Sequence, residues 1–148
     1  MKEFFQMLKK DHVEVKGILD QLVETEKSKK REELFHTLTI ELVPHMKAEE
    51  SAFYAPLAAK KEAREEALEG IEEHHVSELV LKELEKMPKG KDEWGAKINV
   101  FKELVEHHIK DEESKVFKSA KKAFKKSELE DIMKKFEKEK EKIKKSLK

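Results

Sequence analysis

Two segments of the sequence share one pattern: HMKAEESAF at residues 45–53 and HIKDEESKVF at residues 108–117. Each has a histidine, the triplet Glu-Glu-Ser beginning four residues later, and a phenylalanine about one turn further on. In an α-helix, side chains four residues apart lie on one face, so a single metal ion or ion pair can reach both. The repeat therefore predicts two equivalent helices, one presenting His45 with Glu49 and the other His108 with Glu112.

The apolar residues along the rest of the chain recur at three- and four-residue steps, which is the pattern of amphipathic helices. With only 4 Gly and 3 Pro, the composition favours long helices over turn-rich β structure. The pattern predicts five helices, at about residues 2–26, 31–58, 61–87, 92–125 and 127–148. Short polar loops between the first four predict an all-α fold, an antiparallel up-down-up-down four-helix bundle with an additional C-terminal helix.

The last helix differs from the others in its high content of Lys and Glu. We expect residues 1–126 to form the bundle and residues 127–148 to form a charged C-terminal helix that docks on the bundle or extends from it. Ser127 and Glu130 have the spacing of a capping box that would begin this helix. Acidic residues interleave with its lysines, which is typical of a solvated face.

The composition excludes several classes of protein. Lys+Arg and Asp+Glu both number 33, which argues against binding nucleic acid or an anionic membrane through bulk positive charge. The absence of Cys excludes disulfides, thiolate metal sites, iron–sulfur clusters and cysteine nucleophiles. No apolar run approaches the roughly 20 residues that span a bilayer, and the beginning of the chain lacks a secretory pattern. We expect a cytoplasmic protein without a nucleic-acid or membrane partner.

The histidines carry the functional information. Six of the seven lie near the middle of an expected helix, and each bundle helix has at least one. His36 is different, because the residue four positions on is not a carboxylate. Asp11-His12 on the first helix is echoed by Glu73-His74 on the third. Single histidines that alternate with His–Glu pairs predict a two-metal carboxylate site in the core of the bundle.

The chemistry of these groups restricts the metal. Imidazole and carboxylate without thiolate suit iron, manganese or zinc rather than copper(I). A carboxylate can bridge two ions and offset their repulsion, and Glu49 and Glu112 come from different helices. Burial of such groups without metal would cost several kcal/mol each, or force them to take up protons. We therefore expect metal binding to be coupled to folding of the bundle.

The ordered motifs resemble the hemerythrin-like, or HHE cation-binding, family over about residues 3–125. The matching motifs are Asp11-His12, His45-x-x-x-Glu49-Glu50 with Phe53-Tyr54-Ala55-Pro56, Glu73-His74-His75-Val76, and His107-His108-x-x-x-Glu112-Glu113 with Phe117. The resemblance implies a four-helix bundle with a non-haem centre of two iron ions, bridged by two carboxylates and an oxo or hydroxo group. It also implies reversible binding of dioxygen, or a role in sensing or handling oxygen, nitric oxide, peroxide or iron.

The resemblance implies a set of metal ligands: His12, His45, Glu49, His74, His75, His108 and Glu112. Glu49 and Glu112 would bridge the two irons. His74 and His75 are alternatives, because adjacent side chains diverge by about 100° around a helix. We favour His74, since the acidic residue before it parallels Asp11 before His12, although apolar neighbours lie near the side of His75.

Two positions depart from the oxygen-carrying hemerythrins. Those proteins place two histidines four residues apart on the third helix, whereas Glu78 follows His74 at that spacing here. They also separate the last histidine from its carboxylate by five residues, which keeps His107 as an alternative to His108. Glu78 is thus a possible additional ligand, and redox or iron-related roles stay open beside oxygen carriage.

Two other interpretations compete with this one. A ferritin-like di-iron oxidase would use Glu33-x-x-His36 and Glu72-x-x-His75, but it leaves the other inward histidines without roles. A metal-free structural or partner-binding helical bundle would treat the histidines as incidental. We favour a metal- and oxygen-binding protein, with a small ligand such as dioxygen or nitric oxide, over a dedicated enzyme.

Overall fold

The computed structural model describes residues 2–148, and the elements in that range are all helical, as predicted. In chain order they are α1 (Lys2–Glu24), α2 (Ser28–Glu49), the π-helical turn η1 (Glu50–Tyr54), α3 (Ala55–Ala58), the 3-10 turn η2 (Lys61–Ala63), α4 (Arg64–Lys86), α5 (Asp92–Asp111), the π-helical turn η3 (Glu112–Val116), α6 (Phe117–Ala123) and α7 (Lys126–Leu147). Among these helices none has both the length and the apolar character that crossing a membrane requires.

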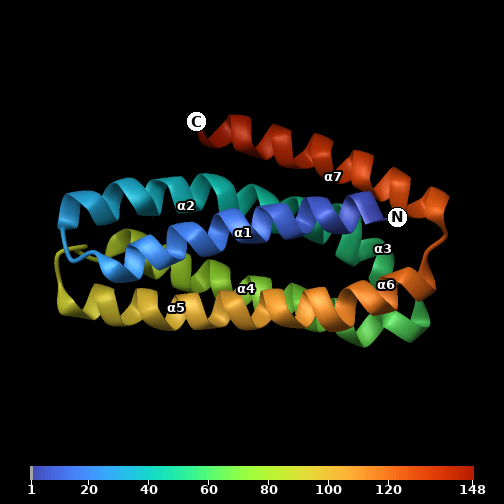
Figure 1. The fold of residues 1–148 in the computed structure, drawn as a ribbon, viewed down its shortest axis with the longest axis horizontal. Helices are drawn as coiled ribbons and strands as arrows, with labels where there is room; N and C mark the ends of the chain where they lie inside the picture. The colour runs from blue at the N-terminus through green and yellow to red at the C-terminus, as the bar shows by residue number, and fades with distance from the viewer. Residues whose placement is uncertain (1) are drawn as a thin grey trace.

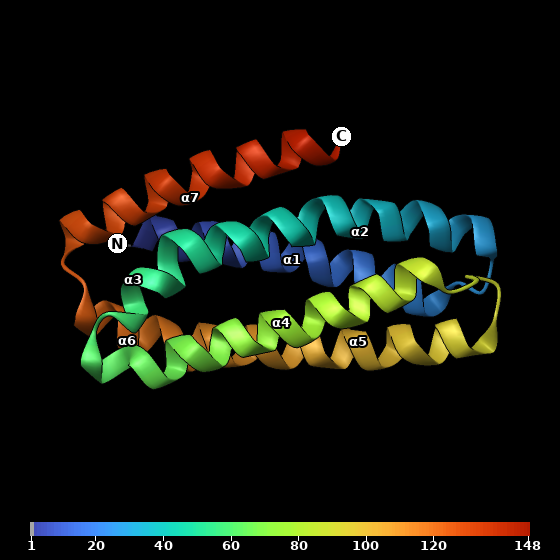
Figure 2. The same cartoon turned by 180° about the vertical axis from the view of Figure 1, so that it is seen from behind.

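Four long segments lie lengthwise side by side: α1, α2 with α3, α4, and α5 with α6 (Figure 1). Consecutive segments run in opposite directions, as the colour gradient shows. α1 packs against α2 and α5, and α4 packs against α5. α7 turns back along the outside and packs mainly against α2, which is also clear from behind (Figure 2). The term long segments is used below for these four: α1, α2 with α3, α4, and α5 with α6.

The beginning of α7 corrects one sequence prediction. Glu128, rather than Glu130, caps this helix: its carboxylate accepts a hydrogen bond of 2.9 Å from the backbone N–H of Lys125. The predicted capping box at Ser127 and Glu130 is wrong, because α7 already begins at Lys126 and both residues lie inside it. An acidic residue near the start of a helix also interacts favourably with the helix dipole.

Two apolar clusters fill the interior, towards opposite ends of the long segments. One joins the start of α1 to η1, α6 and α7, and it contains Phe4, Phe53 and Phe136. The other joins the later part of α1 to α2, α4 and α5, and it contains Leu19 and Trp94. A layer of buried polar residues separates them: Asp11, His12, His45, Glu49, His74, His108 and Glu112. Apolar packing on both sides keeps water from this layer, so its polar groups depend on one another.

Candidate metal centre

Each long segment contributes one buried histidine: His12 from α1, His45 from α2, His74 from α4 and His108 from α5. Two glutamates lie one helical turn beyond a histidine of their own segment, Glu49 at the end of α2 and Glu112 at the start of η3. Both glutamates are 0% exposed. Each π-helical turn begins at or directly after its glutamate, and such turns are frequent at functional sites.

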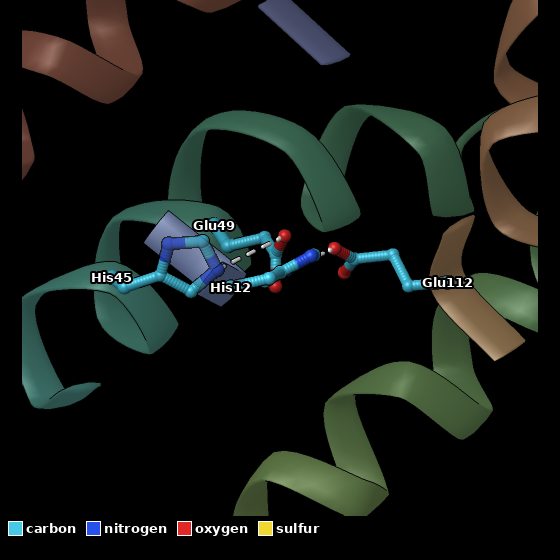
Figure 3. A group of neighbouring side chains, drawn as sticks. All are labelled: His12, His45, Glu49 and Glu112. Atoms are coloured by element: carbon cyan, nitrogen blue, oxygen red, sulfur yellow. Dashed lines mark ion pairs between the residues drawn. The ribbon is translucent and has the colours of Figure 1, made fainter. Parts of the chain in front are cut away.

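Figure 3 shows one half of this centre, where the carboxylate of Glu112 points toward the ring of His12 and the carboxylate of Glu49 lies beside the ring of His45. Glu112 Oε1 lies 3.1 Å from Nε2 of His12, a residue of another segment. Glu49 Oε2 lies 3.6 Å from Nε2 of His45, a residue of its own segment. The first contact joins α1 to η3, and the second lies within α2; ligand atoms of all four residues lie within 4.8 Å of one another.

The other half of the centre repeats these contacts. Glu49 Oε1 lies 3.1 Å from Nε2 of His74, and Glu112 Oε2 lies 3.6 Å from Nε2 of His108. The α1–α2 half therefore corresponds to the α4–α5 half, as the repeated sequence segments suggest. Each glutamate reaches one histidine of its own segment and one of another, which is the arrangement that a carboxylate bridging two ions requires.

The outer nitrogen of every histidine in the centre donates a hydrogen bond to a carboxylate. The four bonds run from Nδ1 of His12 to Glu113 (2.6 Å), His45 to Asp11 (2.8 Å), His74 to Glu50 (3.0 Å) and His108 to Glu73 (2.7 Å). Each bond holds the ring with Nε2 directed inward, and this outer carboxylate partner is typical of histidines that bind metal ions.

The sequence motifs alone assign no role to these outer carboxylates. Each is the sequence neighbour of a central residue, as in Asp11-His12 and Glu49-Glu50, so an indication was present. The pairing itself crosses between segments: Asp11 holds His45 rather than the adjacent His12. Neighbours in sequence point in different directions around a helix, so only the packing of the segments selects these pairs.

Burial and neighbouring charges shift the pKa values of the two glutamates in opposite directions. Burial and the charge of Glu112 raise the pKa of Glu49 well above its ordinary value. Burial also acts to raise the pKa of Glu112, but contacts with His108 and His12 outweigh it and hold that pKa well below its ordinary value. Without a cation, two carboxylates buried side by side therefore favour the uptake of a proton by the pair.

The pKa values of the four histidines also shift in opposite directions: two are lowered and two are raised. Burial lowers the pKa of His45 and of His74. Burial also acts to lower the pKa of His108, but the surrounding carboxylates, Glu112 first, raise it to about 9. The pKa of His12 is raised as well, because contact with Glu112 outweighs burial. A cation bound here displaces these protons, so its binding is linked to pH.

Several atoms of this layer have no hydrogen-bond partner. They are His45 Nε2, both side-chain oxygens of Glu49, and Glu112 Oε1. Such a buried atom costs about 1–3 kcal/mol, and more if it is charged. The potential ligand atoms form two groups, each within 4.8 Å: His12, His45, Glu49 and Glu112, and Glu49, His74 and His108. The shared Glu49 and the nitrogen–oxygen donor set fit two neighbouring cations such as iron, manganese or zinc.

A cavity of about 20 Å³ adjoins the four histidines. The other residues that line it are Val15, Leu42, Met46, Ser77, Val105 and Ile109. Its volume accommodates one water-sized or diatomic molecule. Ser77 is the one polar side chain in the lining apart from the histidines.

Several residues considered from the sequence lie elsewhere. His75 and His107 are exposed and belong to neither buried group; His107 lies beside Asp111, with its Nε2 3.1 Å from Asp111 Oδ2, in a more exposed cluster that also includes Glu73. Glu78 forms an ion pair of 2.8 Å with Lys47. The residues of the alternative oxidase motif are exposed rather than gathered in the core: Glu33, His36, Glu72 and His75.

Tyr54 also lies in the centre, although the sequence motifs alone assign it no role there. It is 0% exposed, its hydroxyl donates a hydrogen bond to Glu112, and the same oxygen lies 3.3 Å from Nε2 of His108. Burial and the charges of Glu112 and Glu49 raise the pKa of Tyr54 well above its ordinary value. Gly70, a glycine in the middle of a helix, was the available sequence indication, because it lies against this ring.

Comparison with protein-family models gives a match to the family described as Hemerythrin HHE cation binding domain, over residues 3–120. Comparisons with curated proteins and with solved structures give no match. The matched range contains the histidines and glutamates of the buried centre, whereas α7 lies beyond it.

Proposed function

Because this chain belongs to the hemerythrin HHE cation-binding domain family, we propose that it holds two non-haem iron ions and uses them to bind or sense a small ligand. The observation that carries the proposal is the convergence of buried nitrogen and oxygen atoms in two groups that share Glu49, with several of these atoms lacking a hydrogen-bond partner. In this proposal the long segments are the family's four-helix bundle, residues 1–126, and residues 127–148 are an added helix.

The residues divide between the two ions as follows. His12 and His45 hold one iron, and His74 and His108 hold the other. Glu49 and Glu112 contribute to both, which accounts for the way each carboxylate reaches histidines of two segments. Iron supplies reversible ligand binding and electron transfer when it is present, which zinc in the same ligand set does not.

The protein's own groups define which ligand fits. The cavity beside the histidines is about 20 Å³ in volume, and aliphatic side chains and Met46 form most of its lining. Such a space favours an uncharged diatomic molecule, dioxygen or nitric oxide, over an anion or a larger substrate. The cavity contains no acid or base besides the histidines, which favours binding or sensing over catalysed turnover. A cytoplasmic location and the absence of a nucleic-acid partner stay predictions.

The outer carboxylates complete the proposed centre. They accept the Nδ1 protons of the histidines, which directs each Nε2 inward and makes the rings stronger donors to a cation. They also supply four negative charges around the two cations, in addition to those of Glu49 and Glu112. The chain itself thus positions the ligands before any metal arrives.

The test is metal analysis of protein produced with ample iron. We expect about two irons per chain in the wild type, because each bridging glutamate is well used only when both positions are filled. Glu112→Ala should reduce the content to one iron or fewer, since Glu112 touches both positions. His36→Ala is the matched control, because His36 is exposed, and it should retain two. Zero or one iron in the wild type contradicts the proposal.

A further inference from the structure

Tyr54 is the residue that most clearly breaks the correspondence between the two halves of the centre. It lies five residues after Glu49, and the residue five after Glu112 is Phe117. Both side chains are buried aromatic rings, but only one has a hydroxyl group. The two halves are otherwise alike in their histidines, glutamates and outer carboxylates, so this oxygen makes the two metal positions chemically different.

The hydroxyl of Tyr54 lies among atoms that belong to the metal position of His74 and His108. It contacts Glu112, and it lies 3.3 Å from the inward nitrogen of His108. That nitrogen in turn lies 3.0 Å from the inward nitrogen of His74. A hydroxyl group has one proton, so it cannot donate to all of these neighbours at once. A cation among them can be bound by every one.

The ring of Tyr54 is held firmly in this place. It stacks on Phe53, with ring centroids 5.5 Å apart, and it lies 5.3 Å from the ring of His74. A Cβ atom at Gly70 would lie 2.9 Å from Cζ of the ring, closer than real contacts allow. Glycine inside a helix costs about 1 kcal/mol relative to alanine. Gly70 thus keeps open the space through which the phenol reaches the centre.

We propose that Tyr54 is a further ligand of the metal ion held by His74 and His108, bound through its phenolate oxygen. This inference rests on the proposed di-iron function. Coordination forms one metal–oxygen bond and breaks the O–H bond, and the proton leaves to solvent, as it does for other protein ligands on metal binding. No electron is transferred, so no oxidant is required. The other ion has no such ligand, because Phe117 occupies the corresponding place.

The test uses the fact that the chain has 1 Tyr. Phenolate bound to iron(III) gives a visible charge-transfer absorption, and laser excitation in that band enhances the ring vibrations of the bound phenolate. We expect both in the iron(III)-loaded wild type, and we expect the vibrations to shift when the protein contains ring-deuterated tyrosine. Tyr54→Phe should retain two irons and lose the band. The isotope experiment needs no substitution, so it holds even if that variant folds poorly.

A pair of glycine variants provides a matched control. Gly70→Ala adds a methyl group against the ring and should weaken or shift the band. Gly17→Ala adds the same group to another helix where nothing lies within 4 Å, and it should leave the band unchanged. Two irons without enhanced tyrosine vibrations would overturn the assignment of Tyr54 and leave the di-iron proposal intact. If the wild type does not bind two irons, the assignment of Tyr54 and the di-iron proposal are both contradicted.

Discussion

At each histidine of the centre, the two ring nitrogens have different partners. In His108, Nδ1 donates to Glu73 while Nε2 faces the buried glutamates, and the other three rings follow the same rule. A neutral imidazole has one N–H and one lone pair, so fixing the proton outward places the lone pair inward. The outer carboxylate thereby selects the tautomer that binds a cation.

Ser77 is the polar exception in the cavity, and it gives a prediction at this scale. Its hydroxyl can donate a hydrogen bond to a diatomic ligand, and a hydrogen bond of this kind contributes about 1 kcal/mol. Ser77→Val should therefore release nitric oxide from the iron(II) protein roughly fivefold faster, as followed by stopped-flow absorbance. Ser51→Val, at an exposed position, is the control. Equal release rates in wild type and Ser77→Val would mean that the hydroxyl does not reach the ligand.

Among the helices, α7 contacts the buried centre although it lies outside the range that matches the family model. Lys140 contacts both carboxylate oxygens of Asp11 at 2.8 Å, and Asp11 in turn accepts the hydrogen bond from His45. Phe136 packs edge-on against the ring of His45, with centroids 5.6 Å apart. α7 therefore covers the α1–α2 half of the centre. In the other half Glu73 plays the role of Asp11, and its side chain is 33% exposed against 10% for Asp11.

This chain of contacts gives a prediction for α7. Lys140→Ala removes the cation that fixes Asp11, so His45 should be held less firmly and iron should be lost faster to a chelator. Loss of an outer partner costs metal affinity roughly tenfold or more, and a group one step further out should have a smaller effect, about threefold. The rate of iron transfer to the chelator is the measurement.

Lys138→Ala is the control for this experiment, because Lys138 lies on the same helix and is exposed. It removes the same charge from α7 without touching Asp11. If the two variants lose iron at the same rate, the effect is a general one of charge, and α7 does not act on the centre through Lys140.

For the whole molecule, the buried layer makes stability depend on pH. The pKa of His108 is raised to about 9 from 6.5, so in the metal-free protein its stabilising effect is complete below pH 6.5 and is lost as the pH rises through 9. The shift corresponds to a free energy on the order of 3 kcal/mol. His12, whose pKa is also raised, acts in the same direction. Metal-free protein should therefore become less stable between pH 6.5 and 9.

The metal-loaded protein should respond in the opposite sense. Iron competes with the protons on Glu49, His12 and His108, so its affinity and the stability that it adds both increase with pH. We expect the difference in Tm between iron(II)-loaded and metal-free protein to widen from pH 6.5 to pH 8.5. Thermal melting of both forms at the two pH values is the measurement. Identical melting curves for the two forms would favour the metal-free structural bundle.

Local helical geometry explains what the sequence by itself determined. The spacing of four residues between His45 and Glu49, and between His108 and Glu112, places each pair on one face of any α-helix, wherever that helix packs. Helical periodicity and the scarcity of Gly and Pro likewise predicted the all-helical fold, which is confirmed. The family resemblance, confirmed over residues 3–120, rests on the order of these local motifs along the chain.

Contacts between segments were decided only by the tertiary structure. His74 faces the core and His75 the solvent because the apolar packing of α4 sets the rotation of the helix, and a rotation of about 100° would exchange them. The pairing of Asp11 with His45, and the reach of Tyr54 into the far half, depend on the axial shift between segments. No single helix contains that information, since rotation and shift follow from the packing of all the apolar faces together.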